Sequence, residues 1–179
     1  NLQDIDSKLA ITYNDTSEFN LSMGSGAARI NHFSQSHQIT NELAVQSMGG
    51  YNLKMLLDTN LISSLKDSLK DNPINKATLT FHQTNATEQL KAHTSLSLVR
   101  VDSLGTKMFI RDFFEGAQHF GGTLENHQYV FNISKYLSRL MSDELPVEEL
   151  YLTPIGASVN ANRTLLTEEV ELNITYTNF

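Results

Sequence analysis

The sequence predicts a mainly β protein, in the form of a two-sheet antiparallel, jelly-roll-like β-sandwich with two short helices capping its ends. Three observations support this fold class. Many segments alternate apolar and polar residues with the period of two that is typical of strands. The alternation leaves one face of each strand polar, which favours antiparallel over parallel sheets. Two further segments follow the helical period, and each lies between two predicted strands.

The C-terminal segment EVELNITYT has the clearest strand pattern. Every second residue is apolar, and the residues between them are polar or charged. We expect the apolar set to face a core and the polar set to face water. The apolar set is Val170, Leu172, Ile174 and Tyr176.

The segment INKATLTFHQT, residues 74–84, alternates in the same way. Ala77, Leu79 and Phe81 are expected to point inward, whereas His82 is expected at the outer surface. The segment GGYNLKMLLD repeats the pattern. Its apolar set is Tyr51, Leu53, Met55 and Leu57.

Further strands are predicted in KLAITY, EFNLSM, HTSLSLVRV, TKMFIR, HQYVFNI and EELYLTP. In SLSLVRV the alternation places Arg100 on the same face as Leu96 and Leu98. Because a charged guanidinium is costly in a core, we expect a bulge or an exposed edge near Val99.

Two segments have a helical apolar stripe. In DTNLISSLKDSLKD, Asp58 or Thr59 can cap the helix, and in NISKYLSRLMSD, Asn132 or Ser134 can do so. The first stripe is Leu61, Ile62, Leu65 and Leu69, and the second is Ile133, Tyr136, Leu137, Leu140 and Met141. Each helix is expected to close an open end of the sandwich.

The composition of the chain restricts its class. The 179 residues, 40% of them hydrophobic and 18% charged, are typical of a globular protein, and we predict one domain over residues 1–179. A formal net charge of −7 disfavours nucleic acid as a partner, because phosphate binding needs clustered Lys and Arg. No apolar run has the roughly 18 residues that a membrane helix needs. The absence of cysteine excludes disulfides and thiolate metal sites.

The order of these segments resembles that of a known module. A strand and short helix lead to Ile74, Ala77 and Leu79, and these are followed by YVFNISKYL, ELYLTP and NRTLL before the last strand. Over roughly residues 50–179 this order resembles the carbohydrate-binding-like jelly-roll modules of the DNRLRE type, found in Bacteroidetes surface lipoproteins of unknown function. The chain departs from that pattern because it has no tryptophan at the second helix.

The resemblance implies a location and a role. We expect an extracytoplasmic protein at the cell surface or outer membrane, or in the periplasm, that reaches the membrane only through a lipid anchor outside this chain. The chain begins at Asn1 rather than at methionine, so we expect it to be the C-terminal part of a longer lipoprotein precursor. The implied role is a non-catalytic binding or adhesion module whose partner is a glycan or a surface protein.

The loop RDFFEGAQHFGG is the strongest candidate for ligand binding. It combines aromatic rings, which stack on sugar rings, with polar groups that can bind hydroxyls. The alternative is that its phenylalanines close the end of the sandwich. The candidate residues are Asp112, Phe113, Phe114, Glu115, His119 and Phe120.

The sequence indicates no catalytic residue, metal site or cofactor. The His32 to His37 spacing fits neither a helical nor a strand pair of metal ligands, and Ser25 lacks the sequence context of a nucleophile elbow. Asp4 and Asp6 are the only indication of calcium, and they lack a third ligand.

Two alternative functions stay open. A polysaccharide-acting hydrolase would need two carboxylates about 5–10 Å apart across a cleft, and the acids of the aromatic loop region, Asp102, Asp112 and Glu115, are candidates. A structural subunit of a surface assembly would show an unpaired strand edge or an inserted donor strand.

Overall fold

The computed structural model describes residues 8–13, 17–22, 43–70, 72–84, 90–156 and 161–178. The chain divides into two compact units, residues 1–36 and residues 37–179, and each is described by itself. In the first unit, β1 (Lys8–Tyr13) and β2 (Ser17–Ser22) form an antiparallel pair, as their alternation predicts. The prediction of a single domain over residues 1–179 stays a prediction.

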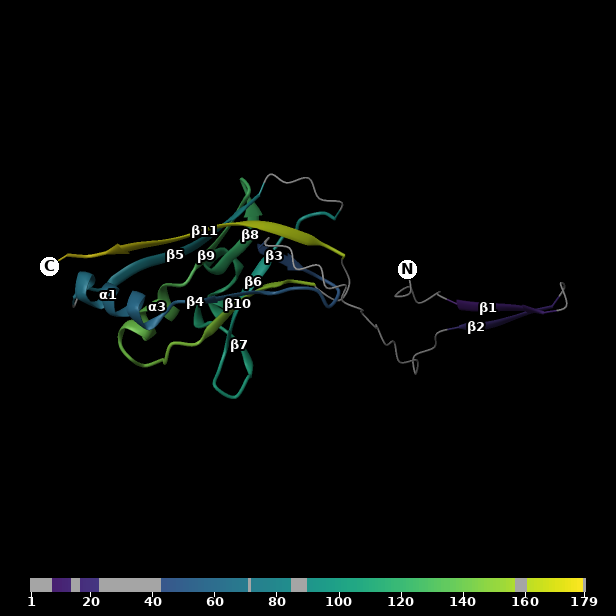
Figure 1. Ribbon diagram of the computed structural model, residues 1–179, viewed down its shortest axis with the longest axis horizontal. Helices are drawn as coiled ribbons and strands as arrows, with labels where there is room; N and C mark the ends of the chain where they lie inside the picture. Colours follow the sequence, from purple (N-terminus) through teal and green to yellow (C-terminus); the bar gives the residue numbers. More distant parts are fainter. Residues whose placement is uncertain are drawn as a thin grey trace. The chain divides into compact units, whose positions relative to one another are not determined.

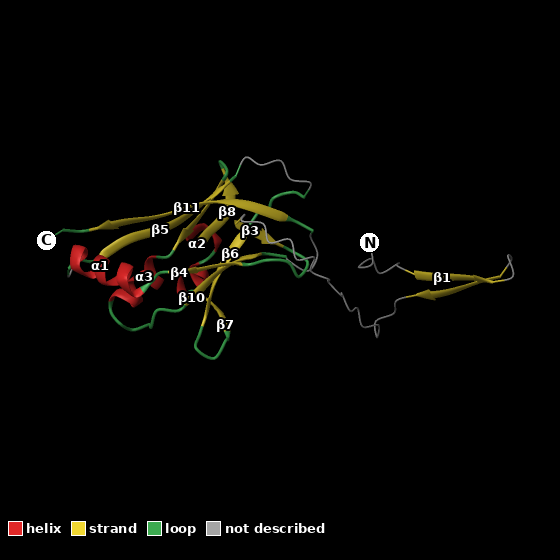
Figure 2. Ribbon diagram, in the orientation of Figure 1, coloured by secondary structure: helices red, strands yellow, loops and turns green. Residues whose placement is uncertain are grey.

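The second unit holds two antiparallel sheets (Figures 1 and 2). The five-stranded sheet has the order β3-β11-β5-β9-β8, and the four-stranded sheet has the order β4-β10-β6-β7. The first consists of β3 (Leu43–Gln46), β11 (Arg163–Tyr176), β5 (Ile74–Gln83), β9 (Gln128–Asn132) and β8 (Gly121–Glu125). The second consists of β4 (Leu53–Leu56), β10 (Glu149–Pro154), β6 (Leu96–Val101) and β7 (Lys107–Phe109).

The inner faces of the two sheets meet in one apolar core, which confirms the predicted β-sandwich. Leu79 and Phe81 of β5 are about 1% exposed and belong to the same cluster as Leu98 of β6 and Leu152 of β10. At about 25 cal/mol per Å², burial of these side chains is the main favourable term for holding the sheets together. His82 lies on the outer face, where it pairs with Glu171 at 3.0 Å.

Both predicted helices are present, and they lie side by side at one end of the sandwich (Figure 1). The first, α1 (Thr59–Leu69), begins with the predicted cap, because Asp58 Oδ1 accepts a hydrogen bond from the Leu61 backbone N–H at 2.7 Å. The second, α3 (Ser134–Met141), buries Tyr136, Leu137 and Leu140 in the core. The sequence did not predict η1 (Arg111–Glu115) and α2 (Ala117–Phe120), which occupy the candidate loop.

The expectation of a bulge or exposed edge near Val99 is wrong. Strand β6 pairs with β10 and β7 without a register shift, and Val99 is 8% exposed. Arg100 is accommodated on the inner face by an ion pair with Glu148, whose side chain is 10% exposed. Burial, together with the Glu148 charge, raises the pKa of the neighbouring Tyr136 to about 12.

Two of the residues predicted to face the core from the last strand are more exposed than expected. Leu172 and Ile174 of β11 pack against the core, whereas Val170 and Tyr176 are 37% and 45% exposed. Tyr51, which precedes β4, is 45% exposed as well.

Candidate functional site

A groove of about 610 Å³ lies on the outer face of the five-stranded sheet. Strands β5 and β9 form its floor, and α2 with β8 forms its wall. The floor residues are Lys76, Thr78, Gln128, Val130 and Asn132. The wall residues are Ala117, Gln118, His119, Phe120, Gly121, Gly122, Thr123 and Glu125.

The floor follows from strand alternation and register. Thr78 of β5 lies opposite Asn132 of β9, and His82 lies opposite Gln128, so the outward residues of both strands share one surface. The sequence indicates which residues of each strand point outward. It does not indicate that β5 and β9, about 50 residues apart, are neighbours in the sheet. For this reason, the floor was missed by sequence reasoning.

Two glycines hold the wall close to the floor. Gly121 and Gly122 have φ angles of 79° and 85°, which favour glycine, and the ladder between β8 and β9 is irregular between Gly121 and Leu124. A Cβ atom at Gly121 would lie 2.2 Å from the carbonyl oxygen of Val130. The lack of a side chain there lets α2 turn directly into β8 beside the floor.

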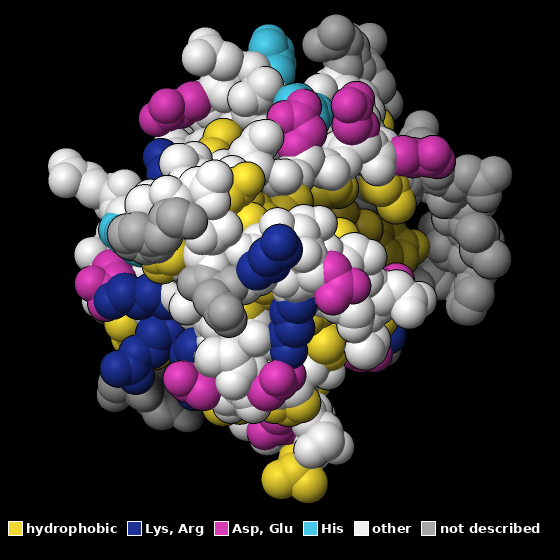
Figure 3. Space-filling model, turned by 90° about the vertical axis from the view of Figure 1, so that its left-hand side faces the viewer, with side chains coloured by type: hydrophobic (Ala, Val, Ile, Leu, Met, Phe, Trp, Pro, Cys, Tyr) yellow, Lys and Arg dark blue, Asp and Glu magenta, His cyan; other side chains and the backbone are white. Residues whose placement is uncertain are grey.

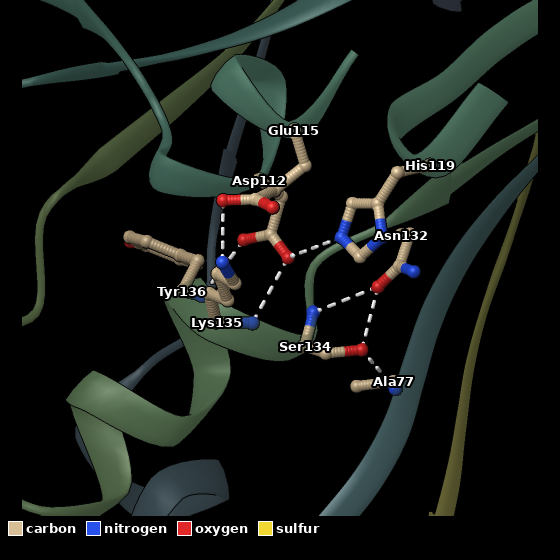
Figure 4. A network of polar contacts seen from close by, with 8 residues as sticks. All are labelled: Ala77, Asp112, Glu115, His119, Asn132, Ser134, Lys135 and Tyr136. Atoms are coloured by element: carbon tan, nitrogen blue, oxygen red, sulfur yellow. Dashed lines mark hydrogen bonds and ion pairs between the residues drawn. The ribbon is translucent and has the colours of Figure 1, made fainter. Parts of the chain in front are cut away.

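Asp112 is a structural residue rather than an exposed ligand (Figure 4). It is 0% exposed, and its Oδ1 and Oδ2 accept hydrogen bonds from the backbone N–H groups of Lys135 at 2.9 Å and Tyr136 at 2.8 Å. These groups belong to the first turn of α3, where N–H groups lack partners within the helix. A carboxylate at this position also interacts favourably with the helix dipole. Asp112 therefore caps α3 from η1.

His119 connects this buried carboxylate to the groove. Its Nε2 atom lies 3.5 Å from Asp112 Oδ1, and its side chain is 33% exposed on the groove wall. Figure 4 shows the imidazole ring between Asp112 and Asn132. The contact with Asp112 orients a ring that also borders the groove.

Asn132 links the floor to the start of α3. Its side-chain oxygen accepts hydrogen bonds from the backbone N–H of Ser134 at 3.1 Å and from the Ser134 hydroxyl at 2.5 Å. The Ser134 Oγ atom in turn accepts the backbone N–H of Ala77 on β5 at 2.8 Å (Figure 4). The N-cap residue of α3 is Ile133, which makes no side-chain cap hydrogen bond, rather than Asn132 or Ser134 as expected. Asn132 instead holds the backbone of the first helical residue, so one side chain contacts both the helix and the groove.

Glu115 lies outside the groove, at the exposed end of η1. It forms an ion pair with Lys135, and this hydrogen bond, supported by the Lys135 charge, lowers the pKa of the Glu115 carboxyl below its ordinary value. The pair adds a second link between η1 and α3.

The phenylalanines of the loop form a cluster of rings that leads from the core to the surface. Phe120 is 3% exposed and packs edge to face on Phe131 and Phe113. Phe113 stacks on Phe109 with ring centroids 4.0 Å apart. Phe114 is 70% exposed and does not line the groove. Of the six predicted binding residues, only His119 and Phe120 line the groove, and Phe120 does so from a largely buried position.

A buried polar network around His93 lies apart from the groove. The Nε2 and Nδ1 atoms of His93 each lie 2.8 Å from a hydroxyl, of Ser47 and Thr164 respectively. The Tyr129 hydroxyl donates to the His93 carbonyl oxygen at 2.6 Å. Burial lowers the pKa of His93 and raises that of Tyr129. Because Ser47 and His93 are 1% and 3% exposed, this network is a satisfied part of the interior.

Several other sequence hypotheses concern residues that the structure does not describe. Asp4, Asp6, Ser25, His32 and His37 lie outside the described residues. The described part of the chain contains no group of three His, Cys, Asp or Glu side chains arranged to hold a metal. It also contains no helix with the length and apolarity to cross a membrane.

The fold and groove define a mainly β two-sheet sandwich with an open groove on the outer face of the five-stranded sheet. No protein-family model, no curated protein and no solved structure matches the chain. The resemblance to DNRLRE-type modules therefore stays a prediction.

Proposed function

We propose that the protein is a non-catalytic extracytoplasmic binding or adhesion module whose groove takes a glycan. The observation that carries this proposal is the composition of the groove. Three amide side chains, Gln118, Gln128 and Asn132, are joined there by the hydroxyls of Thr78 and Thr123. Amides and hydroxyls both donate and accept hydrogen bonds, as sugar hydroxyls do.

The groove is large and open enough for this class of ligand. Its volume of about 610 Å³ lies within the range of roughly 300–1,000 Å³ typical of ligand sites. Val130 supplies an apolar spot on the floor, 40% exposed, for the C–H face of a sugar ring. Lys76 and Glu125 add one charge of each sign, so the lining does not select for a strongly charged ligand.

The proposed contacts differ from those that the loop sequence favours. The three phenylalanines serve mainly as a packed cluster, as the alternative interpretation of the loop held, and the exposed ring of Phe114 lies away from the groove lining. Recognition is therefore assigned to hydrogen bonds on the sheet face, with His119 as the one predicted loop residue that contributes a polar group.

A glycan array tests the proposal. The Gln128→Ala and His119→Ala variants should each lose at least tenfold in affinity for any glycan that the protein binds, because each removes a polar contact from the groove. The matched control is Phe114→Ala, which should retain the affinity. Loss of binding in the Phe114 variant alone, or no binding to any glycan, would contradict the proposal.

The hydrolase alternative has less support. Glu125 is the only carboxylate among the described residues that line the groove, whereas two-carboxylate hydrolysis needs a pair facing the substrate. Release of reducing sugar from a polysaccharide, abolished by Glu125→Gln, would favour the enzyme over the binding module.

A further inference from the structure

Strand β11 is paired on both sides over only part of its length. Residues 163–166 pair with β3, and Leu166 pairs with β5 as well, whereas Val170–Tyr176 pairs with β5 alone among the described residues. Alternate backbone N–H and C=O groups of this seven-residue stretch therefore point toward the edge of the sheet. An edge of this kind is a template for another strand unless it is protected.

The apolar face of the same stretch is incompletely covered. On β5, the partners Phe81, Leu79 and Ala77 are 1% exposed or less. On β11, the opposite residues Val170, Leu172 and Ile174 are all at least partly exposed, and Tyr176 is 45% exposed. The inward side chains are thus fully buried on β5 and partly exposed on its neighbour β11, at the edge of the sheet. Figure 3 shows apolar side chains gathered in a hollow on this end of the molecule, beneath acidic side chains.

The charge on this edge is acidic. Glu168, Glu169 and Glu171 are exposed, and residues 167–176 contain no lysine or arginine. Acidic side chains on an edge disfavour pairing with a second acidic edge, but they attract a strand that carries lysine or arginine.

We propose that the Val170–Tyr176 edge of β11 binds an extended partner segment, which adds as a strand to the five-stranded sheet. Main-chain hydrogen bonds to this edge, which no described residue pairs with, would hold the segment. Its apolar residues, at every second position, would cover Val170, Leu172, Ile174 and Tyr176. The residues between them would be polar and basic and would meet the glutamates. This surface is separate from the groove, so the proposal does not depend on glycan binding.

A second copy of the chain is a less suitable occupant. Two β11 edges brought together would give the glutamates no basic partner, because residues 167–176 contain no lysine or arginine. Sedimentation velocity distinguishes the two occupants. If two copies pair through this edge, the protein sediments as a dimer at micromolar concentrations. If the edge binds a basic partner, the protein alone sediments as a monomer.

Hydrogen exchange with a designed probe tests the proposal. The probe is a nine-residue peptide that alternates valine with lysine and threonine, and two controls carry glutamate for lysine or proline at two of the valines. The protein alone should exchange alternate amides of Val170–Tyr176 quickly, and saturating probe should slow them. The glutamate control should bind about tenfold more weakly, since opposite charges on neighbouring strands favour pairing and like charges oppose it. The proline control should not bind, because proline lacks the N–H donor.

Three results would overturn the proposal. The first is that all amides of Val170–Tyr176 are already protected in the protein alone. The second is that the probe protects a different strand. The third is that the probe, at millimolar concentration, leaves exchange unchanged. Gln128→Ala should leave probe binding intact, so failure of the glycan test and failure of this one are distinguishable.

Discussion

The Oδ2 atom of Asp112 accepts the backbone N–H of Tyr136 at 2.8 Å, and this contact fixes the start of α3 from a different element of the chain. A fully buried carboxylate in a loop of aromatic residues would be a costly group without such partners. Its exposed sequence neighbour Glu115 reaches the same helix through Lys135. The two acids of η1 thus differ in their importance for stability.

Asp112→Ala should lower the free energy of unfolding by about 2–4 kcal/mol, because it removes two charge-assisted hydrogen bonds and leaves helix N–H groups buried without partners. Urea denaturation followed by circular dichroism measures the change. Asp112→Asn should be milder, since an amide retains one acceptor. The matched control Glu115→Ala should leave the transition midpoint nearly unchanged. An equal loss in both alanine variants would contradict the capping role.

The buried His93 should make the protein sensitive to mild acid. Burial lowers its pKa in the folded state, so below the unfolded value of about 6.5 the unfolded chain binds a proton that the folded protein does not. His93 therefore costs the folded protein no stability well above pH 6.5. Below that value the free energy of unfolding declines as the pH falls, by at most about 1.4 kcal/mol per pH unit.

Denaturation curves between about pH 7 and pH 5 check this pH dependence. His93→Gln should reduce overall stability and remove the contribution of His93 to the slope, whereas the control His82→Gln, on the outer face, should retain it. An unchanged slope in the His93 variant would show that other groups cause the acid sensitivity.

Tyr136 should titrate late in the folded protein. Its pKa of about 12 exceeds the unfolded value of about 10, so the folded protein holds a proton that the unfolded chain has released. Stability from this group is present below pH 10 and is lost as the pH rises toward 12. Tyrosinate absorbance measures the ionisation, and Tyr136→Phe should remove the late step. A late step that persists in this variant would assign it to another residue.

The two glycines at the groove wall should tolerate substitution poorly. Gly121→Ala adds a Cβ atom 2.2 Å from the Val130 carbonyl oxygen, in addition to strain at a φ angle of 79°. Gly105→Ala is the matched control, because Gly105 has a similar φ of 80° but open space around it. Strain alone costs roughly 1–2 kcal/mol, and the Gly121 variant should lose clearly more. Equal thermal shifts in the two variants would mean that the contact with Val130 is relieved cheaply.

The strands and the main helices could be predicted from the sequence because they depend on local patterns. The inward set on β5 and the Asp58 cap of α1 follow directly from alternation and capping chemistry. Arg100 was misjudged because its partner, Glu148, lies 48 residues away in the chain. A buried ion pair leaves no local signal.

The candidate site was predicted only in part for the same reason. Two residues of the candidate loop, His119 and Phe120, line the groove. The role of Asp112 depends on helix N–H groups that come 23 and 24 residues later. From its residue type alone, Asp112 was predicted to bind a ligand, whereas in the structure it caps α3. The floor of the groove depends on strand pairing, which alternation does not specify.

The double role of Asn132 limits how this surface can diversify. Under the proposed function, exchange of Gln128 for another polar residue should affect glycan recognition alone. Exchange of Asn132 for a residue without a side-chain acceptor also removes the oxygen that Ser134 uses where α3 begins. In a saturation mutagenesis screen for folded protein, Gln128 should therefore accept many residue types and Asn132 few, so new specificities would arise at one end of the floor.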